Sequence, residues 1–205
     1  KLQVLNENNE IVDEWVSTDT PHHVSGLEEN KSYILHEEIC VDGFVKATDI
    51  EFTVTTDKET QKVIMVDKIV SMSKQDIGGN EIEGAEMTVT DENNEIVDSW
   101  TSTKEPHHIS NLEENKKYVL HELYAPDTFV VATDVEFTVT TDKETQEIVL
   151  IDKTVEISKQ DISGNEIEGA TMVVTNTKTK NIVDKWVSTD TPHKVSGLVE
   201  GENYI

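Results

Sequence analysis

Apolar and polar residues alternate one by one along most of the chain, which is the spacing of half-buried β-strands. The clearest example occurs twice, as VIMVDKIVSMSKQD at residues 63–76 and as IVLIDKTVEISKQD at residues 148–161. No segment has the sustained spacing of three to four residues that marks an amphipathic helix. The pattern therefore predicts an all-β protein whose strands are joined by polar turns.

The same pattern recurs along the chain. EFTVTTDKETQ stands unchanged at residues 51–61 and 136–146, a shift of 136 − 51 = 85 residues. Tryptophan recurs with it, and a period of this length suits a small self-contained domain. We therefore expect three tandem repeats: a first repeat at 1–67 that lacks its first strand, a complete middle repeat at 68–152, and a third repeat at 153–205 that lacks its C-terminal strands. This register is expected of a window from a longer array.

About seven short strands are expected within the middle repeat. The first is predicted over residues 69–74, and another over 107–112. Residues 131–139 have the cleanest alternation, and a hairpin over 141–145 leads to the last strand at 148–152. Short strands separated by turns predict an antiparallel β-sandwich or partly open barrel. The joint between repeats holds no Gly or Pro, so a stiff, extended rod is expected.

Three ionisable residues occupy inward positions of these strands. Lys74 follows Val70 and Met72 in parity, Glu122 ends an alternating strand, and Asp152 ends the last one. An unpaired buried charge is costly, so each of them should have a partner. Burial disfavours the charged forms, and a neutral lysine is a nucleophile. Lys74 could then attack the Asp152 carboxyl with help from Glu122. A buried salt-bridged triad, or charges that reach solvent at strand ends, are the alternatives.

The charge of the chain excludes several classes of partner. Lys and Arg total 17 against 42 Asp and Glu, which gives a net charge of −25. A chain this acidic is repelled by nucleic acid and by anionic membrane surfaces. No apolar run is long enough to span a membrane. Cys40 is the single cysteine, so no internal disulfide can form, and it is interpreted as a small packed residue.

Several motifs together resemble the Cna B-type repeat, the prealbumin-like domain of Gram-positive surface adhesins and pilins. The motifs are ISKQDISGNEIEGA at 157–170, SMSKQDIGGNEIEGA at 71–85, DSWTSTKEPHHISNL at 98–112, YVLHELYAPDTFVVA at 118–132 and VEFTV at 135–139. The resemblance covers the entire chain. The first copy departs from it at residues 39–44, where ICVDGF replaces the Ala-Pro segment, and this affects only a loop.

The resemblance implies an intramolecular isopeptide bond between a lysine on the first strand and an Asn or Asp on the last, assisted by a central glutamate. The matching residues of the middle repeat are Lys74, Asp152 and Glu122. Glu37 and Asp67 are the corresponding residues of the first repeat. Lys159 is the corresponding lysine of the third.

Other chemistry is poorly supported by the sequence. The paired histidines at 22–23 and 107–108 lack a second ligand set at zinc spacing, and the third copy has a lysine in the second position. The acidic segments at 7–10 and 91–95 lack the spacing of a calcium loop. The three tryptophans suit core or edge packing. We therefore expect no metal and no cofactor.

The sequence thus predicts a structural protein and not an enzyme: a repeat segment of an extracellular fibre, a pilus or a cell-wall-anchored adhesin stalk. Its partners would be neighbouring repeats and, by strand donation, other copies, in which Lys159 of one chain meets Asp67 of another. The first alternative is an adhesin repeat that binds a host or matrix molecule. The second is a hydrolase that uses Glu122 with another carboxylate, which requires solvent access to both.

Overall fold

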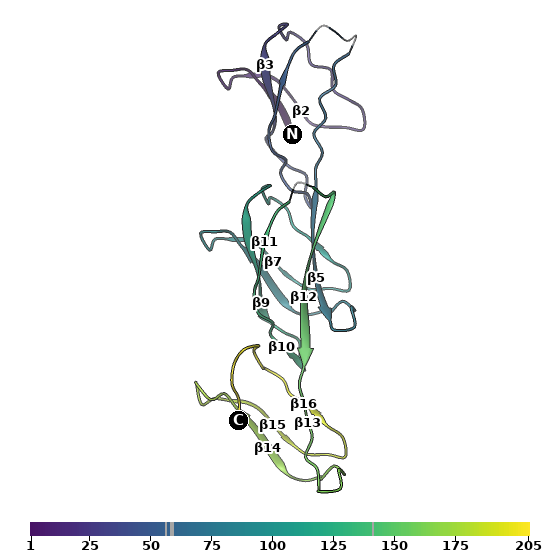
Figure 1. Ribbon diagram of the computed structural model, residues 1–205, viewed down its shortest axis with the longest axis vertical. Coiled ribbons are helices and arrows are strands. Elements are labelled where there is room, and N and C mark those ends of the chain that lie inside the picture. Colours follow the sequence, from purple (N-terminus) through teal and green to yellow (C-terminus); the bar gives the residue numbers. More distant parts are fainter. Residues whose placement is uncertain (56, 58–59, 141) are drawn as a thin grey trace. The chain divides into compact units, whose positions relative to one another are not determined.

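The computed structural model describes residues 1–55, 57, 60–140 and 142–205 (Figure 1). Thr141, where the hairpin before the last strand of the middle repeat was predicted to begin, lies outside them. The described residues form strands and no helix, so none of them offers a helix that could cross a membrane. The strands are β1 (Leu2–Leu5), β2 (Ile11–Trp15), β3 (Ser32–Glu37), β4 (Ile50–Thr53), β5 (Ile69–Asp76), β6 (Glu86–Thr90), β7 (Ile96–Thr101), β8 (His107–His108), β9 (Lys117–Tyr124), β10 (Phe129–Val130), β11 (Val135–Thr138), β12 (Thr145–Thr154), β13 (Glu156–Ile157), β14 (Thr171–Thr175), β15 (Ile182–Val187) and β16 (His193–Lys194).

The chain divides into two compact units, and the first comprises residues 1–71, 108–117 and 138–147. Its sheet has the antiparallel order β2-β1-β3-β4. Val4, Tyr33 and Leu35 are buried at its centre, with Trp15 and Phe52 packed against them. Every second residue of β3 is buried, because successive side chains of a strand point to opposite faces.

The second unit comprises residues 72–107, 118–137 and 148–205. In the sheet β11-β9-β6-β7, β6 pairs with both β7 and β9, so that Met87 lies opposite Trp100 on one side and Glu122 on the other. A second sheet has the order β10-β12-β5-β8, in which the first and last strands of the middle repeat are neighbours. Two further antiparallel pairs, β13-β16 and β14-β15, follow in the third repeat. The predicted all-β, antiparallel fold class is confirmed.

Two predicted strands differ from the observed ones. The strand expected over 107–112 ends at His108: the Ile109 amide still donates to the Val70 carbonyl of β5, whereas the Leu112 carbonyl accepts a hydrogen bond from the Lys46 amide of the first repeat. The strand expected over 131–139 begins only at Val135, because the Val131 amide donates to Leu198. In both places the alternating residues pair with another repeat, which the alternation itself could not indicate.

Candidate functional site

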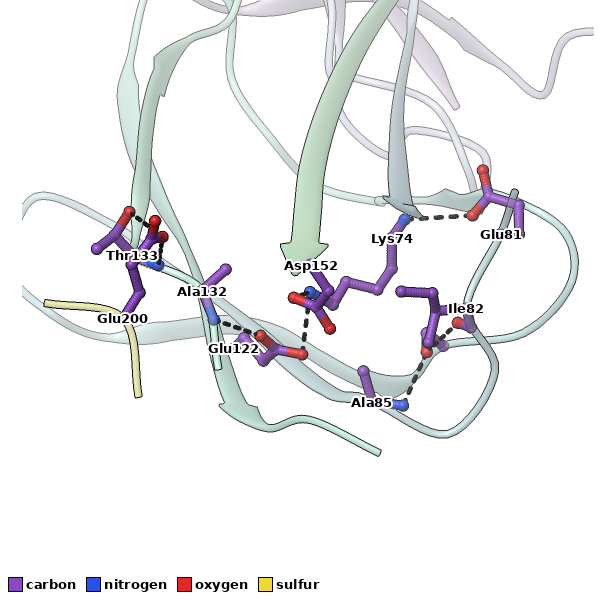
Figure 2. Close-up of polar contacts among 10 residues, drawn as sticks. Lys74, Glu81, Ile82, Ala85, Glu122, Ala132, Thr133, Asp152 and Glu200 are labelled. Atoms are coloured by element: carbon purple, nitrogen blue, oxygen red, sulfur yellow. Dashed lines mark hydrogen bonds and ion pairs between the residues drawn. The ribbon is translucent and has the colours of Figure 1, made fainter. Parts of the chain in front are cut away.

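Lys74, Glu122 and Asp152 are brought together by three strands of the second unit. Lys74 lies near the end of β5 and Asp152 near the end of the neighbouring β12, while Glu122 lies on β9 (Figure 2). All three residues are buried, together with Met72, Leu120 and Leu150, which precede them by two positions in their strands. The common inward parity that the sequence predicted for these three residues is therefore observed.

The three charged groups contact one another in a site closed to solvent. The Lys74 ammonium donates a hydrogen bond to Asp152 Oδ1 and lies 3.0 Å from Glu122 Oε1. The side chain of Lys74 is 2% exposed and the two carboxylates are 0% exposed. These contacts rule out charges that reach solvent at strand ends, and the burial leaves no access for the substrate of a hydrolase.

Glu122 is held in place by the backbone of the loop that follows its strand. Its Oε2 accepts a hydrogen bond of 2.7 Å from the Ala132 amide, while Oε1 faces Lys74 (Figure 2). Among the described residues, neither Glu122 Oε1 nor Asp152 Oδ2 has a hydrogen-bond partner of good geometry. Glu122 Oε1 is nevertheless ion-paired with Lys74, so Asp152 Oδ2 is the oxygen of the two without such a contact, and one explanation of such a buried oxygen is a catalytic role.

Burial shifts the pKa of both carboxyls. It raises the pKa of Glu122 to about 7, with the Asp152 charge acting in the same direction and with the Ala132 amide and Lys74 opposing it. Burial also raises the pKa of Asp152, against the hydrogen bond and charge of Lys74. A carboxyl whose pKa lies near neutral pH can both accept and return a proton, as general acid–base catalysis requires.

A small cavity adjoins the lysine. It has a volume of about 10 Å³ and is lined by Met72, Lys74, Trp100, His107 and Leu120, among others. This volume is close to the minimum that one water molecule occupies. The cavity therefore offers space for about one water molecule beside Lys74, and neither Glu122 nor Asp152 lines it.

Two residues that the sequence analysis did not single out fix the backbone around Lys74. Glu81 Oε2 accepts a hydrogen bond of 3.2 Å from the Lys74 amide, and the Lys74 carbonyl accepts one of 2.7 Å from the Ile82 amide. Ser102 Oγ donates to the Ile82 carbonyl and accepts from the Ala85 amide. Their recurrence in the sequence could have pointed to them, because the third repeat has Glu166 and Ser188 in the same roles.

The first repeat has the same carboxylate pair in a more open setting. Glu37 is buried and accepts a hydrogen bond of 2.8 Å from the Ala47 amide, as Glu122 does from Ala132. Asp67 is only partly buried, and burial, together with the Glu37 charge, raises its pKa. Glu37 and Asp67 therefore lie together as predicted, without a lysine between them among the described residues.

Cys40 lies beside this pair, and the three ligand atoms of Glu37, Cys40 and Asp67 are within 4.8 Å of one another. Burial raises the pKa of the Cys40 thiol to about 12, and the two carboxylates act in the same direction. The thiol is therefore protonated at neutral pH, whereas a metal binds the thiolate.

Lys159 is partly buried in the third repeat, and its backbone repeats the contacts of Lys74. Its amide donates to Glu166 Oε2 at 3.1 Å, and its carbonyl accepts from the Ile167 amide at 2.6 Å. In the described part of the chain its ammonium makes no ion pair. The local structure that positions the lysine is thus the same in both repeats.

The recurring tryptophans and histidines form pairs in all three repeats. Trp100 stacks on His107 with ring centroids 4.3 Å apart, and His107 Nε2 lies 2.8 Å from Asp98 Oδ2. The same arrangement occurs around Trp15 and Trp186. The stacked histidine of each repeat thus packs on the tryptophan at the sheet edge. This is consistent with the packing role expected for the tryptophans.

The comparisons with known proteins concern the fold. The chain is similar to a streptococcal ancillary pilin (15% identity, 83% of this chain and 64% of that chain, TM-score 0.39) and to the Bacillus anthracis TIE protein (20% identity, 95% and 40%, TM-score 0.34). It is also similar to a C-terminal fragment of the pilus adhesin SpaC from Lactobacillus rhamnosus GG (15% identity, 76% and 88%, TM-score 0.38). The chain thus spans less than two thirds of the first two. No curated protein is similar enough to count as a relative.

The middle repeat has a direct family match. Residues 68–154 match the family model described as SpaA: Prealbumin-like fold domain. This range holds Lys74, Glu122 and Asp152. Residues 68–154 therefore belong to the prealbumin-like fold domains of the SpaA family, in agreement with the resemblance that the motifs indicated.

Proposed function

We propose that the chain is a structural repeat segment of an extracellular fibre, a pilus or a cell-wall-anchored adhesin stalk, stiffened by a Lys74–Asp152 isopeptide bond. The observation that carries this proposal is the contact of Lys74 with Asp152, beside Glu122, in a site closed to solvent. The match of residues 68–154 to the family model described as SpaA: Prealbumin-like fold domain supports the fold that this proposal requires.

The reaction is a condensation within one repeat. The Lys74 nitrogen attacks the Asp152 carboxyl carbon, a C–N bond forms, and a C–O bond of the carboxyl breaks. Two protons leave the ammonium and depart with the carboxyl oxygen as water. Glu122 lies 3.0 Å from the Lys74 nitrogen and its pKa is raised to about 7, so it can carry the protons and end unchanged. The chemistry is single-turnover and makes the protein a cross-linked structure and not an enzyme.

The bond would contribute a large share of the stability of the repeat. It joins residues 78 positions apart in the sequence. A cross-link that acts mainly by restricting the unfolded chain, as described for disulfides, contributes roughly 4–5 kcal/mol for a loop of this length. Single domains have total stabilities of only about 5–15 kcal/mol. Because β5 and β12 are the first and last strands of the repeat, the bond would also carry tension past the strands between them.

The equivalent residues of the other repeats take the same roles in this proposal. In the first repeat Glu37 would assist the reaction, and Asp67 would be the carboxyl that is attacked. In the third repeat Lys159 would be the attacking amine. The raised pKa of Asp67, caused first by burial and then by the Glu37 charge, supports this assignment. Partners would be neighbouring repeats and, by strand donation, other copies in which Lys159 of one chain meets Asp67 of another.

Intact mass spectrometry of the full chain tests the bond. The wild-type chain should be lighter than its sequence by one water molecule. Lys74→Met and Glu122→Ala should each have the full mass of their sequences, whereas Glu83→Ala, a change at an exposed glutamate, should keep the loss. A wild-type chain of full mass would contradict the proposal.

A further inference from the structure

A loop of one repeat bonds to a turn of the next repeat, and this happens twice with the same geometry. Within the first unit the Lys46 amide donates to the Leu112 carbonyl at 2.9 Å. Within the second unit the Val131 amide donates to the Leu198 carbonyl at 2.9 Å. A parallel β-bridge accompanies each bond. Backbone pairing of this kind adds a short strand to an exposed edge.

The first of these contacts is fixed by a buried carboxylate, Glu114. Its Oε2 accepts hydrogen bonds from the amide and the hydroxyl of Thr48, at 3.2 and 2.5 Å, and its Oε1 lies 2.6 Å from the Lys68 ammonium. The Glu114 side chain is 5% exposed. Burial alone would raise its pKa, but the hydrogen bonds from Lys68 and Thr48 lower it below the ordinary value. Glu114 is therefore a carboxylate that is ionised at neutral pH and has three donors.

Glu200 repeats this arrangement in the second unit. Its Oε2 accepts from the amide and the hydroxyl of Thr133, at 3.3 and 3.4 Å (Figure 2), and its Oε1 pairs with the Lys153 ammonium. The hydrogen bond from Lys153, followed by that from the Thr133 amide, lowers the pKa of Glu200. Two independent joints thus have the same acceptor and the same kinds of donor.

Apolar packing accompanies the polar contacts. Val130 of the middle repeat is buried in one cluster with Val174, Val195 and Leu198 of the third repeat. At the other joint, Leu112 is completely buried. Buried apolar side chains thus lie beside the backbone hydrogen bonds of both joints.

We propose that the turns 110–114 and 196–200 are docking sites for the loops 43–48 and 128–133 of the preceding repeat, with Glu114 and Glu200 as their positioning residues. We call this set of contacts the joint clasp. It recognises an extended segment with a buried valine, a threonine whose amide and hydroxyl both donate, and a lysine at the end of the last strand.

The first repeat has the same docking residues. Ser25, Leu27 and Glu29 correspond to Ser110, Leu112 and Glu114. Leu27 is partly exposed, whereas Leu112 is completely buried. We therefore expect residues 25–29 to bind one partner, the corresponding loop of another repeat of this type.

The clasp acts between repeats, whereas the proposed isopeptide bond acts within one, so only its mechanical meaning rests on the proposed stalk function. The clasp would hold successive repeats in one relative orientation. A short joint without the clasp would limit their distance but not their rotation.

The test uses the full chain with Glu114→Ala and Glu200→Ala together. Hydrogen exchange at the amides of Thr48 and Thr133 should become at least about tenfold faster, because each loses a hydrogen bond to a charged acceptor. NMR relaxation should show that neighbouring repeats tumble more independently. Glu83→Ala, at an exposed glutamate 3.9 Å from Lys104, is the matched control and should change neither result.

The outcomes separate the clasp from the cross-link. Unchanged exchange at core amides such as that of Leu120 shows that the double variant is folded, and faster exchange confined to the joints supports the clasp. Wild-type exchange at Thr48 and Thr133, with wild-type tumbling, would overturn it. The loss of one water in the intact mass should persist in the double variant, because Lys74, Glu122 and Asp152 are untouched.

Discussion

The carboxylate pairs of the first and middle repeats have the same residue types but different surroundings: Asp152 lies on β12, whereas Asp67 lies outside the strands. Glu37 and Glu122 are both buried, and each accepts a hydrogen bond from the amide of an alanine ten residues later. Asp152 is 1% exposed, whereas Asp67 is only partly buried. Two carboxylates at matching positions are therefore not sufficient to make the closed site.

The strand that carries the lysine accounts for the difference. In the middle repeat, β5 places Met72 and Lys74 between the two sheets, and both are buried. In the first repeat a groove of about 490 Å³ lies over residues that include Val4, Leu35 and Phe52. In the middle repeat the lysine strand thus supplies both the nucleophile and a buried apolar side chain, Met72.

The largest expected difference in stability between the two repeats is caused by Lys74→Met. The variant keeps the volume of the side chain but cannot form the bond, so the middle repeat should lose roughly 4–5 kcal/mol of stability. For a domain of this size, this lowers the melting temperature by at least about 15 °C. Peptide-resolved hydrogen exchange during thermal unfolding measures each repeat separately. The first repeat is the internal control, and equal losses in both repeats would contradict the prediction.

The second effect is a pH dependence of the Lys74→Met variant. Burial raises the pKa of Glu122 to about 7, and the variant removes the Lys74 charge that opposes this rise. The folded state then binds more protons than the unfolded state at pH values between about 4.5 and 7, so its stability falls as the pH rises through this range. Denaturant unfolding at pH 5 and pH 8 should show a less stable middle repeat at pH 8. Equal stability at the two pH values would refute the prediction.

A smaller effect is expected from Asp67→Asn in the first repeat. Burial, with the Glu37 charge, raises the pKa of Asp67, so ionised Asp67 is unfavourable there. The neutral asparagine should therefore leave the first repeat equally stable or up to about 1 kcal/mol more stable at pH 8. Repeat-resolved hydrogen exchange would measure this change. A loss comparable to that of Lys74→Met would mean that Asp67 already makes a strong structural contact.

The smallest expected difference between the two repeats concerns the histidine that stacks on a tryptophan in each of them. His22 and His107 stack on Trp15 and Trp100 at the same centroid distance of 4.3 Å, and each pairs with an aspartate. His22→Gln and His107→Gln should each cost about 0.5–1.5 kcal/mol, because they remove an aromatic pair. Chemical denaturation with tryptophan fluorescence measures the change. Clearly unequal losses would show that the repeats differ beyond the lysine strand.

The sequence by itself was sufficient to predict the fold class and the three residues that meet in the buried site. Alternation along β5, β9 and β12 placed Lys74, Glu122 and Asp152 on inward faces, and the structure brings these side chains together. This was predictable because the direction of a side chain in a strand depends only on local backbone geometry. The resemblance of the motifs then indicated what chemistry the three groups could perform.

Only the tertiary structure decided how these parts contact one another. The complete exclusion of solvent from the triad, the support of Lys74 by Glu81, and the contact of Glu114 with Lys68 all join residues that alternation cannot relate. The predicted strands 107–112 and 131–139 are shorter in the structure for the same reason, because residues within them bond to another repeat. Strand parity is a property of neighbouring residues, whereas pairing between strands and between repeats depends on which distant surfaces fit together.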